Sequence, residues 1–247
     1  TSWDITAIDN HYVETIEWAL SGATEGNGLT TLDGVEFNVG STTVEWTVTD
    51  STGNFVTCNY IVTVNDEEAP VFVIDCNTIG DQTRNTDTGL ATYTQTNDSW
   101  DVVATDNSGV VNLAWTLSGA TEGNGVNTLE GVVFNVGVTT VTWTVSDNSD
   151  NSIECSFTVT VEDNEDPTYI IGCDAIGNQI RETDEDLPTY TQTNNSWDVV
   201  ATDNVGIESI TWVLDGATEG DGATTLQGVA FNIGVTTVAW TVTDNSG

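Results

Sequence analysis

Residues 138–145 read Val-Thr-Thr-Val-Thr-Trp-Thr-Val, and this alternation decides the fold. Successive side chains of a strand point to opposite faces, so Val141, Trp143 and Val145 would share one face and the threonines would fill the other. β-Branched and aromatic residues at every second position are typical of a half-buried β-strand. We therefore expect one face of this segment to line a core and the other to meet water.

Other segments carry similar apolar patterns, and turn sequences rich in Asp, Asn and Gly separate them. We expect further strands over residues 71–76, 100–104, 110–117, 132–135 and 155–161. No segment shows a convincing helical period. Short strands at regular spacing are typical of a Greek-key sandwich.

The pattern repeats every 97 residues, as Trp3, Trp100 and Trp197 show. Residues 99–107 recur without change at 196–204. We predict an all-β fold of tandem immunoglobulin-like Greek-key β-sandwich modules with a 97-residue repeat. Three repeats are expected, of which the first and third are partial: repeat 1 (1–69), the complete repeat 2 (70–166) and repeat 3 (167–247). The sequence starts and stops in mid-pattern, so we expect both ends to lie within a longer protein.

The charge balance is extreme. There are 39 acidic residues against two arginines and no lysine, a net charge of -37. Nucleic-acid binding depends on clustered Lys and Arg, and an anionic membrane surface would repel this chain, so neither is an expected partner. No run of eighteen apolar residues is present, which argues against membrane insertion. Cations are the natural partners.

The four cysteines indicate a disulfide within repeat 2. In such a sandwich the first and last strands run parallel and adjacent, so Cys76 and Cys155 are within reach of each other. The alternative, Cys58 with Cys76, would leave a last strand of roughly 20 Å and a linker between them. Cys58 and Cys173 would then pair with cysteines beyond this sequence. CxxC spacing is absent, which disfavours zinc, and a disulfide indicates an oxidising compartment.

Three blocks of repeat 2 together carry a family resemblance. Residues 134–137 read Phe-Asn-Val-Gly, residues 139–147 form the strand and turn described above, and residues 155–161 read Cys-Ser-Phe-Thr-Val-Thr-Val. This pattern resembles the hyalin repeat (HYR) domain family. Repeat 1 matches the family's Asp-x-x-Gly-Asn turn at 50–54, whereas repeat 2 has Asp150 where Gly is expected. The resemblance implies an immunoglobulin-like fold and a role in adhesion or extracellular scaffolding, and long acidic arrays of this kind resemble Bacteroidetes-type bacterial surface adhesins.

The best candidate site is the junction between repeats. The linkers 65–70 and 162–167 are acidic, and in this fold two acidic loops of the following repeat face each linker. Ca²⁺ prefers six to eight carboxylate and carbonyl oxygens. We therefore predict calcium at the junctions, with ligands drawn from Asp66, Glu67, Glu68, Asp106, Asn107, Asp147, Asp150, Asp163, Asn164, Glu165, Asp166, Asp203, Asn204 and Asp244. The alternative is that these are solvated turn residues, because Asp and Asn are favoured in turns anyway.

The tryptophans favour packing over recognition. Trp115 and Trp143 occupy inward strand positions, so we expect them in the core. Trp100 begins an expected strand, where a partly exposed, sugar-stacking ring is the alternative. Arg84 and Arg181 recur at one repeat position among carboxylates, which suggests a structural ion pair.

The combined features predict a structural stalk of an extracellular, cell-surface adhesin or filament, stiffened by calcium. Expected partners are neighbouring repeats, other copies in a fibre, and a surface glycan or protein bound at a tip outside this segment. A catalytic function has little support, because His11 is the only histidine and the cysteines are expected to form disulfides. Two alternatives stay open: recognition of glycan or protein through the Gly-Ala-Thr-Glu-Gly loops, and an accessory domain of a secreted enzyme.

Overall fold

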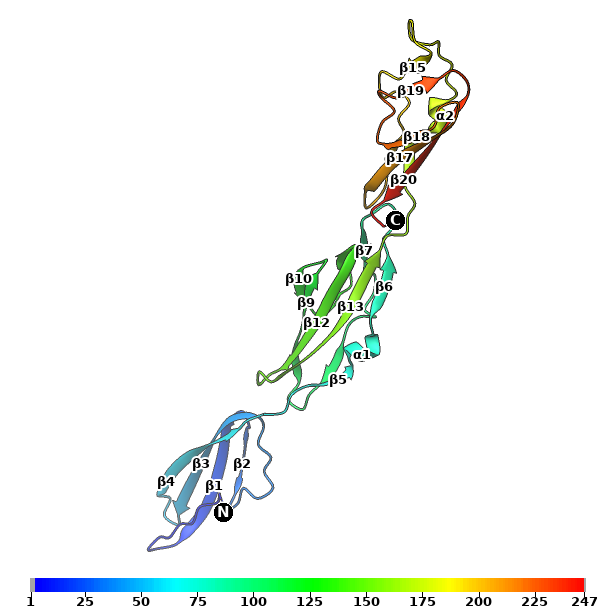
Figure 1. Ribbon diagram of the computed structural model, residues 1–247. Helices are drawn as coiled ribbons and strands as arrows, with labels where there is room; N and C mark the ends of the chain where they lie inside the picture. Colours follow the sequence, from blue (N-terminus) through cyan, green and yellow to red (C-terminus); the bar gives the residue numbers. More distant parts are fainter. Residues whose placement is uncertain (1–2, 247) are drawn as a thin grey trace. The chain divides into compact units, whose positions relative to one another are not determined.

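The computed structural model describes residues 3–246 and forms two compact units (Figure 1). The first unit contains the chain up to Val73 together with Ala104–Leu113 and Thr144–Ile153. The second contains Ile74–Val103, Ala114–Trp143 and the chain from Glu154 onward. Two loop regions of repeat 2 therefore pack with repeat 1. The repeat boundaries after residues 69 and 166 stay predictions.

The fold is all-β, as predicted. In repeat 1 one antiparallel sheet has the order β2-β1-β3-β4, with β1 at Val13–Gly22, β2 at Gly26–Leu29, β3 at Gly40–Asp50 and β4 at Phe55–Val64. Trp18 of β1 lies directly opposite Trp46 of β3. Trp46 is fully buried and forms a core with Leu20, Leu32 and Val44. These aromatic and aliphatic pairs across neighbouring strands stabilise the sheet.

Repeat 2 has one large sheet in the order β10-β9-β12-β13-β6, in which β6 runs parallel to β13. Two short strand pairs, β5 with β8 and β7 with β11, accompany it. The bounds are β5 Val71–Ile74, β6 Gln82–Asn85, β7 Thr92–Thr94, β8 Val103–Thr105, β9 Val110–Gly119, β10 Gly123–Val126, β11 Val133–Asn135, β12 Gly137–Asp147 and β13 Ser152–Glu162.

Repeat 3 copies part of this arrangement. Its main sheet has the order β18-β17-β20, and the pairs β14 with β16 and β15 with β19 match those of repeat 2. The bounds are β14 Thr168–Ile171, β15 Thr189–Thr191, β16 Val200–Thr202, β17 Ile207–Gly216, β18 Gly220–Ala223, β19 Ala230–Asn232 and β20 Thr236–Asp244. The tandem immunoglobulin-like β-sandwich is thus confirmed.

The alternation in residues 138–145 does place one face of the strand in the core. Val141, Trp143 and Val145 of β12 are fully buried. Trp100 is also buried, at 2% exposure, and its ring lies 5.7 Å from that of Phe134 and 6.2 Å from that of Phe157. The alternative of a partly exposed Trp100 is wrong, because that residue lies buried in a turn ahead of β8 rather than at the start of a strand. A sugar-stacking role for Trp100 is excluded with it.

The arginines lie on tryptophans. The guanidinium carbon of Arg84 is 5.3 Å from the ring centroid of Trp100, and that of Arg181 is 5.4 Å from that of Trp197. Each guanidinium also donates to a nearby glutamine, Gln82 or Gln179. Their recurrence therefore reflects a cation–π contact that repeats 2 and 3 share.

A disulfide joins Cys76 to Cys155, the pairing that the sequence favoured, while Cys58 and Cys173 are free. Cys76 does not belong to the first strand. That strand ends at Ile74, and a four-residue helix, α1 Cys76–Ile79, follows it; α2 Cys173–Ile176 repeats it. Asp75 caps α1 by accepting the backbone N–H of Thr78 at 2.8 Å. A helix this short gives no periodic signal in the sequence.

The Gly-Ala-Thr-Glu-Gly loops have a structural explanation. In repeat 1 the Thr24 hydroxyl accepts the backbone N–H of Asn38 at 2.8 Å, and its own N–H donates to the hydroxyl of Thr42 at 3.0 Å. Thr24 is buried. Gly22 has φ +107, which favours glycine. The fold itself therefore accounts for the first glycine and for the threonine of the motif.

A second glycine requirement lies under a tryptophan. A Cβ at Gly125 of β10 would stand 2.6 Å from Cε2 of Trp115, whose indole N–H donates to the carbonyl of Thr128 at 2.9 Å. A Cβ at Gly123, two residues earlier in the same strand, would meet only Leu117 at an ordinary 3.8 Å. Neither glycine has a positive φ, so the two positions differ in packing alone.

We predict that Gly125→Ala destabilises repeat 2 by about 1–3 kcal/mol, because the indole must move or the strand must shift. Gly123→Ala, the matched control, is expected to be neutral or slightly stabilising, since alanine loses less backbone entropy than glycine. Urea unfolding followed by tryptophan fluorescence measures both. Equal effects of the two substitutions would show that the close approach does not restrict position 125.

The turn after β3 holds one unusually acidic carboxyl. Asp50 Oδ1 accepts the backbone N–H groups of Thr52 at 2.7 Å and Asn54 at 2.9 Å, and Oδ2 accepts the Asn54 amide at 2.8 Å. The side-chain hydrogen bonds from Asn54 and then Thr52 lower the pKa of Asp50 to about 2, although desolvation opposes them.

We predict that the Asp50 carboxyl titrates with a midpoint of about 2 rather than 3.8, measured by the pH dependence of its ¹³C chemical shift. The pKa of Asp50 is lower in the folded chain than in the unfolded chain, so the ionised carboxyl stabilises the fold at pH values above its unfolded-state pKa. This contribution to the free energy of unfolding is lost as the pH falls through the folded-state pKa of about 2. Asn54→Ala should raise the midpoint. A midpoint near 3.8 in the unmodified chain would contradict this reading of the turn.

Candidate metal sites

Six of the predicted ligands come together in two groups of three. Triad 1 is Asp66, Asp106 and Asp147, and triad 2 is Asp163, Asp203 and Asp244. In each triad, one carboxylate oxygen from every residue lies within 4.8 Å of the other two. Corresponding members are 97 residues apart, so the triads are a feature of the repeat. Each triad lies within a single compact unit.

Each triad combines a linker with two loops. Asp66 and Asp163 follow β4 and β13, in the acidic linkers. Asp106 and Asp203 follow β8 and β16, whereas Asp147 and Asp244 are the last residues of β12 and β20. Repeat 3 thus supplies two of the three residues of triad 2, and the linker from repeat 2 supplies the third.

The same local turn orients all six aspartates. In every case Oδ1 accepts the backbone N–H two residues ahead, which fixes the carboxylate by an Asx turn. The distances for triad 1 are 3.1, 2.8 and 2.7 Å, with Glu68, Ser108 and Ser149 as donors. For triad 2 they are 3.2, 2.8 and 2.7 Å, with Glu165, Val205 and Ser246 as donors. The side-chain orientation is therefore set by the chain itself.

Several oxygens at these sites are buried without a hydrogen-bond donor. They are Oδ2 of Asp66 in triad 1, and Oδ2 of Asp163, Oδ2 of Asp203 and Oδ1 of Asn204 at triad 2. Asp163 is only 5% exposed. Leaving a buried acceptor unsatisfied costs about 1–3 kcal/mol, and more for a charged group. Such atoms at the centre of an acidic cluster fit a positive ligand.

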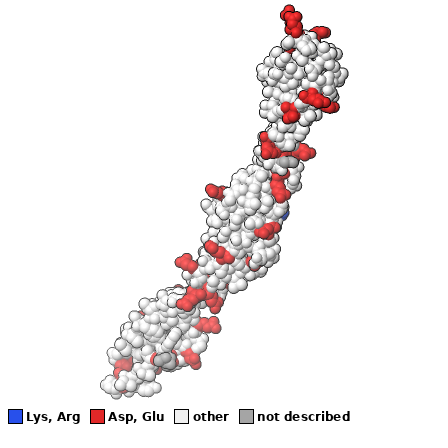
Figure 2. Space-filling model, viewed as in Figure 1, with Lys and Arg blue, Asp and Glu red and all other residues white. Residues whose placement is uncertain are grey.

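Repulsion between the carboxylates of each triad also favours a bound cation. Two like charges 4.8 Å apart repel by about 3 kcal/mol at an effective dielectric constant of 20. The chain has two arginines and no lysine, and both guanidinium groups lie on tryptophans. Figure 2 shows acidic side chains in scattered patches on the visible face and almost no basic ones. Desolvation opposes ionisation of Asp147, yet hydrogen bonds from Asn151 and from the backbone keep its pKa below the usual value.

The donor set fits calcium. Two oxygens that bind one Ca²⁺ at about 2.4 Å are separated by at most about 4.8 Å, which is the limit that each triad meets. All the donors are hard oxygens, which suit Ca²⁺ rather than thiolate-preferring metals. The triad aspartates would hold the ion, and Asn204 Oδ1 would add a neutral ligand at triad 2.

Other predicted ligands lie around the triads and make different contacts. The Asn107 amide donates to Glu68 Oε2 at 3.1 Å, and the Asn164 amide donates to Asn85 Oδ1 at 2.7 Å. Glu165 Oε1 accepts the backbone N–H of Gly89 at 2.8 Å. Three predicted ligands, Glu67, Asp150 and Asp166, are exposed. The structure does not bring these three into a triad, and Asp150 has φ 68, in the position where the turn favours glycine.

Two groups that support the triads were not predicted from the sequence: the side-chain amide of Asn151 and the backbone carbonyl of Leu90. The Asn151 amide donates to Asp147 Oδ2 at 2.9 Å and to the carbonyl of Asp66 at 3.2 Å, so it links the loop to the linker. At triad 2, the Asn204 amide donates to Asp163 Oδ1 at 3.1 Å and to the carbonyl of Leu90 at 2.9 Å. The signal for Asn151 was present, because Asn54 holds the same place in the turn of repeat 1. Leu90 acts through its backbone and carries no sequence signal.

Solved structures with some similarity include fibronectin(III)-like modules and cadherin-type proteins. Fibronectin(III)-like modules of Clostridium thermocellum CbhA are 12% identical, with 64% of this chain and 83% of that chain covered and a TM-score of 0.28. The protocadherin gammaB7 EC3-6 cis-dimer is 14% identical over 95% and 71%, with a TM-score of 0.29. Human CDH23 EC21-23 is 18% identical over 89% and 79%, also with 0.29. We draw no conclusion from likeness at this level.

The family comparison is more informative. Residues 11–64 and 73–161 match the model of the HYR domain, a type of extracellular module that is structural rather than catalytic. Within residues 3–246, no helix has the length and apolar character that crossing a membrane requires. Since the two matched segments cover more than half of the sequence, the chain belongs to the HYR domain family.

Proposed function

We propose that these repeats form part of the shaft of an extracellular adhesin or filament, and that Ca²⁺ bound by each triad joins a linker to the loops it contacts. The buried carboxylate oxygens without donors carry this proposal, Asp163 Oδ2 most of all. They need a positive partner, and the chain's two guanidinium groups are both engaged with tryptophans. A bound cation would supply it at both triads.

A bound cation would stiffen the junction, because its proposed ligands come from different segments of the chain. Asp163 comes from a linker, and Asp203 and Asp244 come from two loops of repeat 3. Without a cation their charges repel and favour separation of these segments. With Ca²⁺ bound, the same charges hold the segments together, so the junction becomes stiffer. A spacer of this kind requires many similar copies, which agrees with the unchanged recurrence of residues 99–107 at 196–204.

The expected partners follow from this role. Neighbouring repeats would contact one another through calcium-bound junctions. We propose two further kinds of partner: other copies of the chain in a fibre, and a surface glycan or protein bound at a tip outside this segment. The strong negative charge would keep unpaired copies apart and soluble.

Calcium titration by calorimetry tests the proposal. We expect two sites with dissociation constants on the order of 10⁻⁴ M, as in other extracellular calcium modules. Asp163→Asn should reduce the stoichiometry from two to one, or weaken one site at least tenfold. Asp166→Asn is the matched control, because Asp166 is an exposed acid three residues further along the same linker and should leave both sites unchanged.

Thermal unfolding provides the second readout. Saturating Ca²⁺ at about 100 times the dissociation constant stabilises a folded site by about 2.7 kcal/mol, so the melting temperature should rise and EGTA should reverse the rise. Identical melting curves in calcium and in EGTA would contradict the proposal. Equal losses of binding in Asp163→Asn and Asp166→Asn would show instead that calcium associates with diffuse surface charge.

A further inference from the structure

The disulfide of repeat 2 connects the start of the repeat directly to its last strand. Cys76 follows β5, the first strand, and Cys155 lies near the start of β13. Their Cα atoms are 5.6 Å apart, although 79 residues separate them in the sequence. Residues 77–154 therefore form a closed loop, and a covalent path that bypasses this loop runs from β5 across the bridge into β13.

The two segments that begin at the bridge run in the same direction. β6 pairs parallel with β13, and Asn85 at its end lies opposite Glu162. The chain from Cys76 to Asn85 therefore runs alongside the chain from Cys155 to Glu162. Tension along the chain enters ahead of Cys76 and leaves after Glu162, so it pulls β13 along its own axis.

The strand β13 can lengthen very little under such tension. A strand rises about 3.3–3.4 Å per residue, and a fully extended chain rises at most about 3.6 Å. Stretching residues 155–162 to this limit would lengthen them by only about 2 Å. The covalent path through the bridge and β13 is therefore almost inextensible.

Without the bridge, the same tension would follow the backbone through the whole loop. Full extension of the 79 residues would release about 260–280 Å, at about 3.3–3.6 Å per residue. The loop contains the buried core residues Trp100, Phe134 and Trp143, so the core would have to unfold before the repeat lengthened that far. The bridge keeps the tension off this core.

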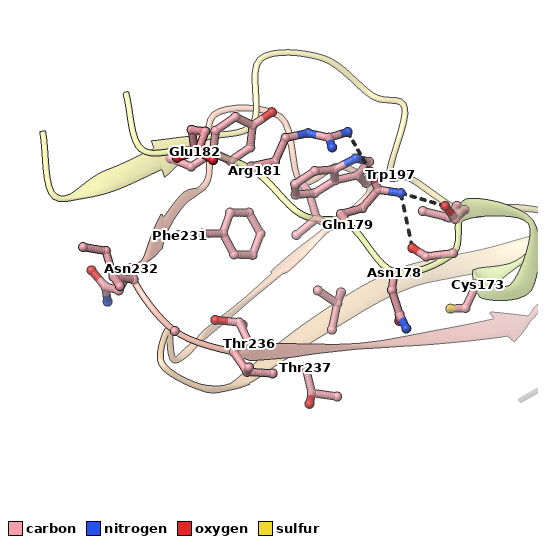
Figure 3. Close-up of a pocket in the computed structure, with 18 of the residues that line it drawn as sticks. Cys173, Asn178, Gln179, Arg181, Glu182, Trp197, Phe231, Asn232, Thr236 and Thr237 are labelled. Carbon is pink, nitrogen blue, oxygen red and sulfur yellow. Dashed lines mark hydrogen bonds between the residues drawn. The ribbon is translucent and has the colours of Figure 1, made fainter. Parts of the chain in front are cut away.

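A local turn presents the first cysteine of the bridge. Cys76 begins α1, and the Gln82 amide closes this turn by donating to two of its carbonyl groups at 2.8 and 3.0 Å. Repeat 3 forms the same turn around Cys173, where the Gln179 amide donates at 2.7 and 3.3 Å (Figure 3). Because Cys173 is free in the described chain, the turn itself and not a disulfide sets the position of this cysteine.

We propose that the Cys76–Cys155 disulfide is the link that carries tension across repeat 2. Tension passes from β5 through the bridge into β13, and residues 77–154 stay folded and free of load. Breaking the bridge converts a nearly inextensible repeat into one that lengthens by about 260–280 Å. The link therefore responds to thiols and not to calcium. This inference rests on the proposed role as a shaft, because only a chain under tension uses such a link.

Single-molecule force spectroscopy of the whole chain, held through fusion handles at its two ends, tests the proposal. Cys58→Ser and Cys173→Ser remove the two exposed free cysteines, so that one bridge is possible. The chain is held in EGTA at a constant load that fully extends a control variant, which also carries Cys76→Ser and Cys155→Ser. Dithiothreitol is then added, and we expect one lengthening step of about 260–280 Å in each chain.

The chemistry of this step is a thiol–disulfide exchange. A dithiothreitol thiolate attacks one sulfur of the bridge, forms a mixed disulfide, and releases the other cysteine as a thiolate. The second thiol of the reagent then releases the remaining cysteine and closes a cyclic disulfide. Dithiothreitol is thus oxidised, and the two cysteines are reduced.

The control variant should show no step that depends on the thiol. The proposal would be overturned by chains that give no step in dithiothreitol, although a free-thiol assay shows that the reagent reduces the bridge in bulk. A step of the full size before the thiol is added would also overturn it, because residues 77–154 would then carry the tension. Failure of calcium binding would contradict the proposed function and leave this step unchanged, so the two failures are distinguishable.

Discussion

The junctions between repeats depend on one constraint. Carboxylate oxygens are buried there, and no positive side chain of the described chain accompanies them. Asx turns fix each aspartate by one oxygen, so these side chains cannot rotate toward water without breaking a hydrogen bond to the backbone. The second oxygens of Asp66, Asp163 and Asp203 have no donor. One divalent cation would answer both problems, because it neutralises the repulsion and replaces the missing donors.

The cores and the junctions are stabilised in different ways. Trp143, Phe134 and Val141 are fully buried in repeat 2 and need no ligand. The contacts of Asn204 with Asp163 and with Leu90 are polar and depend on a linker whose charges repel one another. Removing a cation would therefore loosen the junctions and leave the sheets intact. Stiffness could then be controlled by calcium without any change of fold.

The sequence predicted the fold for identifiable reasons, and all six triad aspartates were among the expected calcium ligands, a role that stays a prediction. Alternation around Trp143 is a local signal, and the aspartates stand in turns that recur with the repeat. The burial of Trp100 could not be read in the same way, because it depends on Phe157, far along the chain, and on Arg84. Nor could the sequence show which acids stay exposed: Asp166 and Asp163 share a linker, and only their surroundings in the fold separate them.

A crystal structure of the chain grown with Ca²⁺ tests the central claim most directly, through the anomalous signal of the ion. We expect a peak at the centre of each triad. At triad 1 it should lie about 2.3–2.6 Å from Asp66 Oδ2. At triad 2 it should lie about 2.3–2.6 Å from Asp163 Oδ2, Asp203 Oδ2 and Asn204 Oδ1. Triads that hold only water at saturating calcium, with their carboxylates turned to solvent, would contradict it.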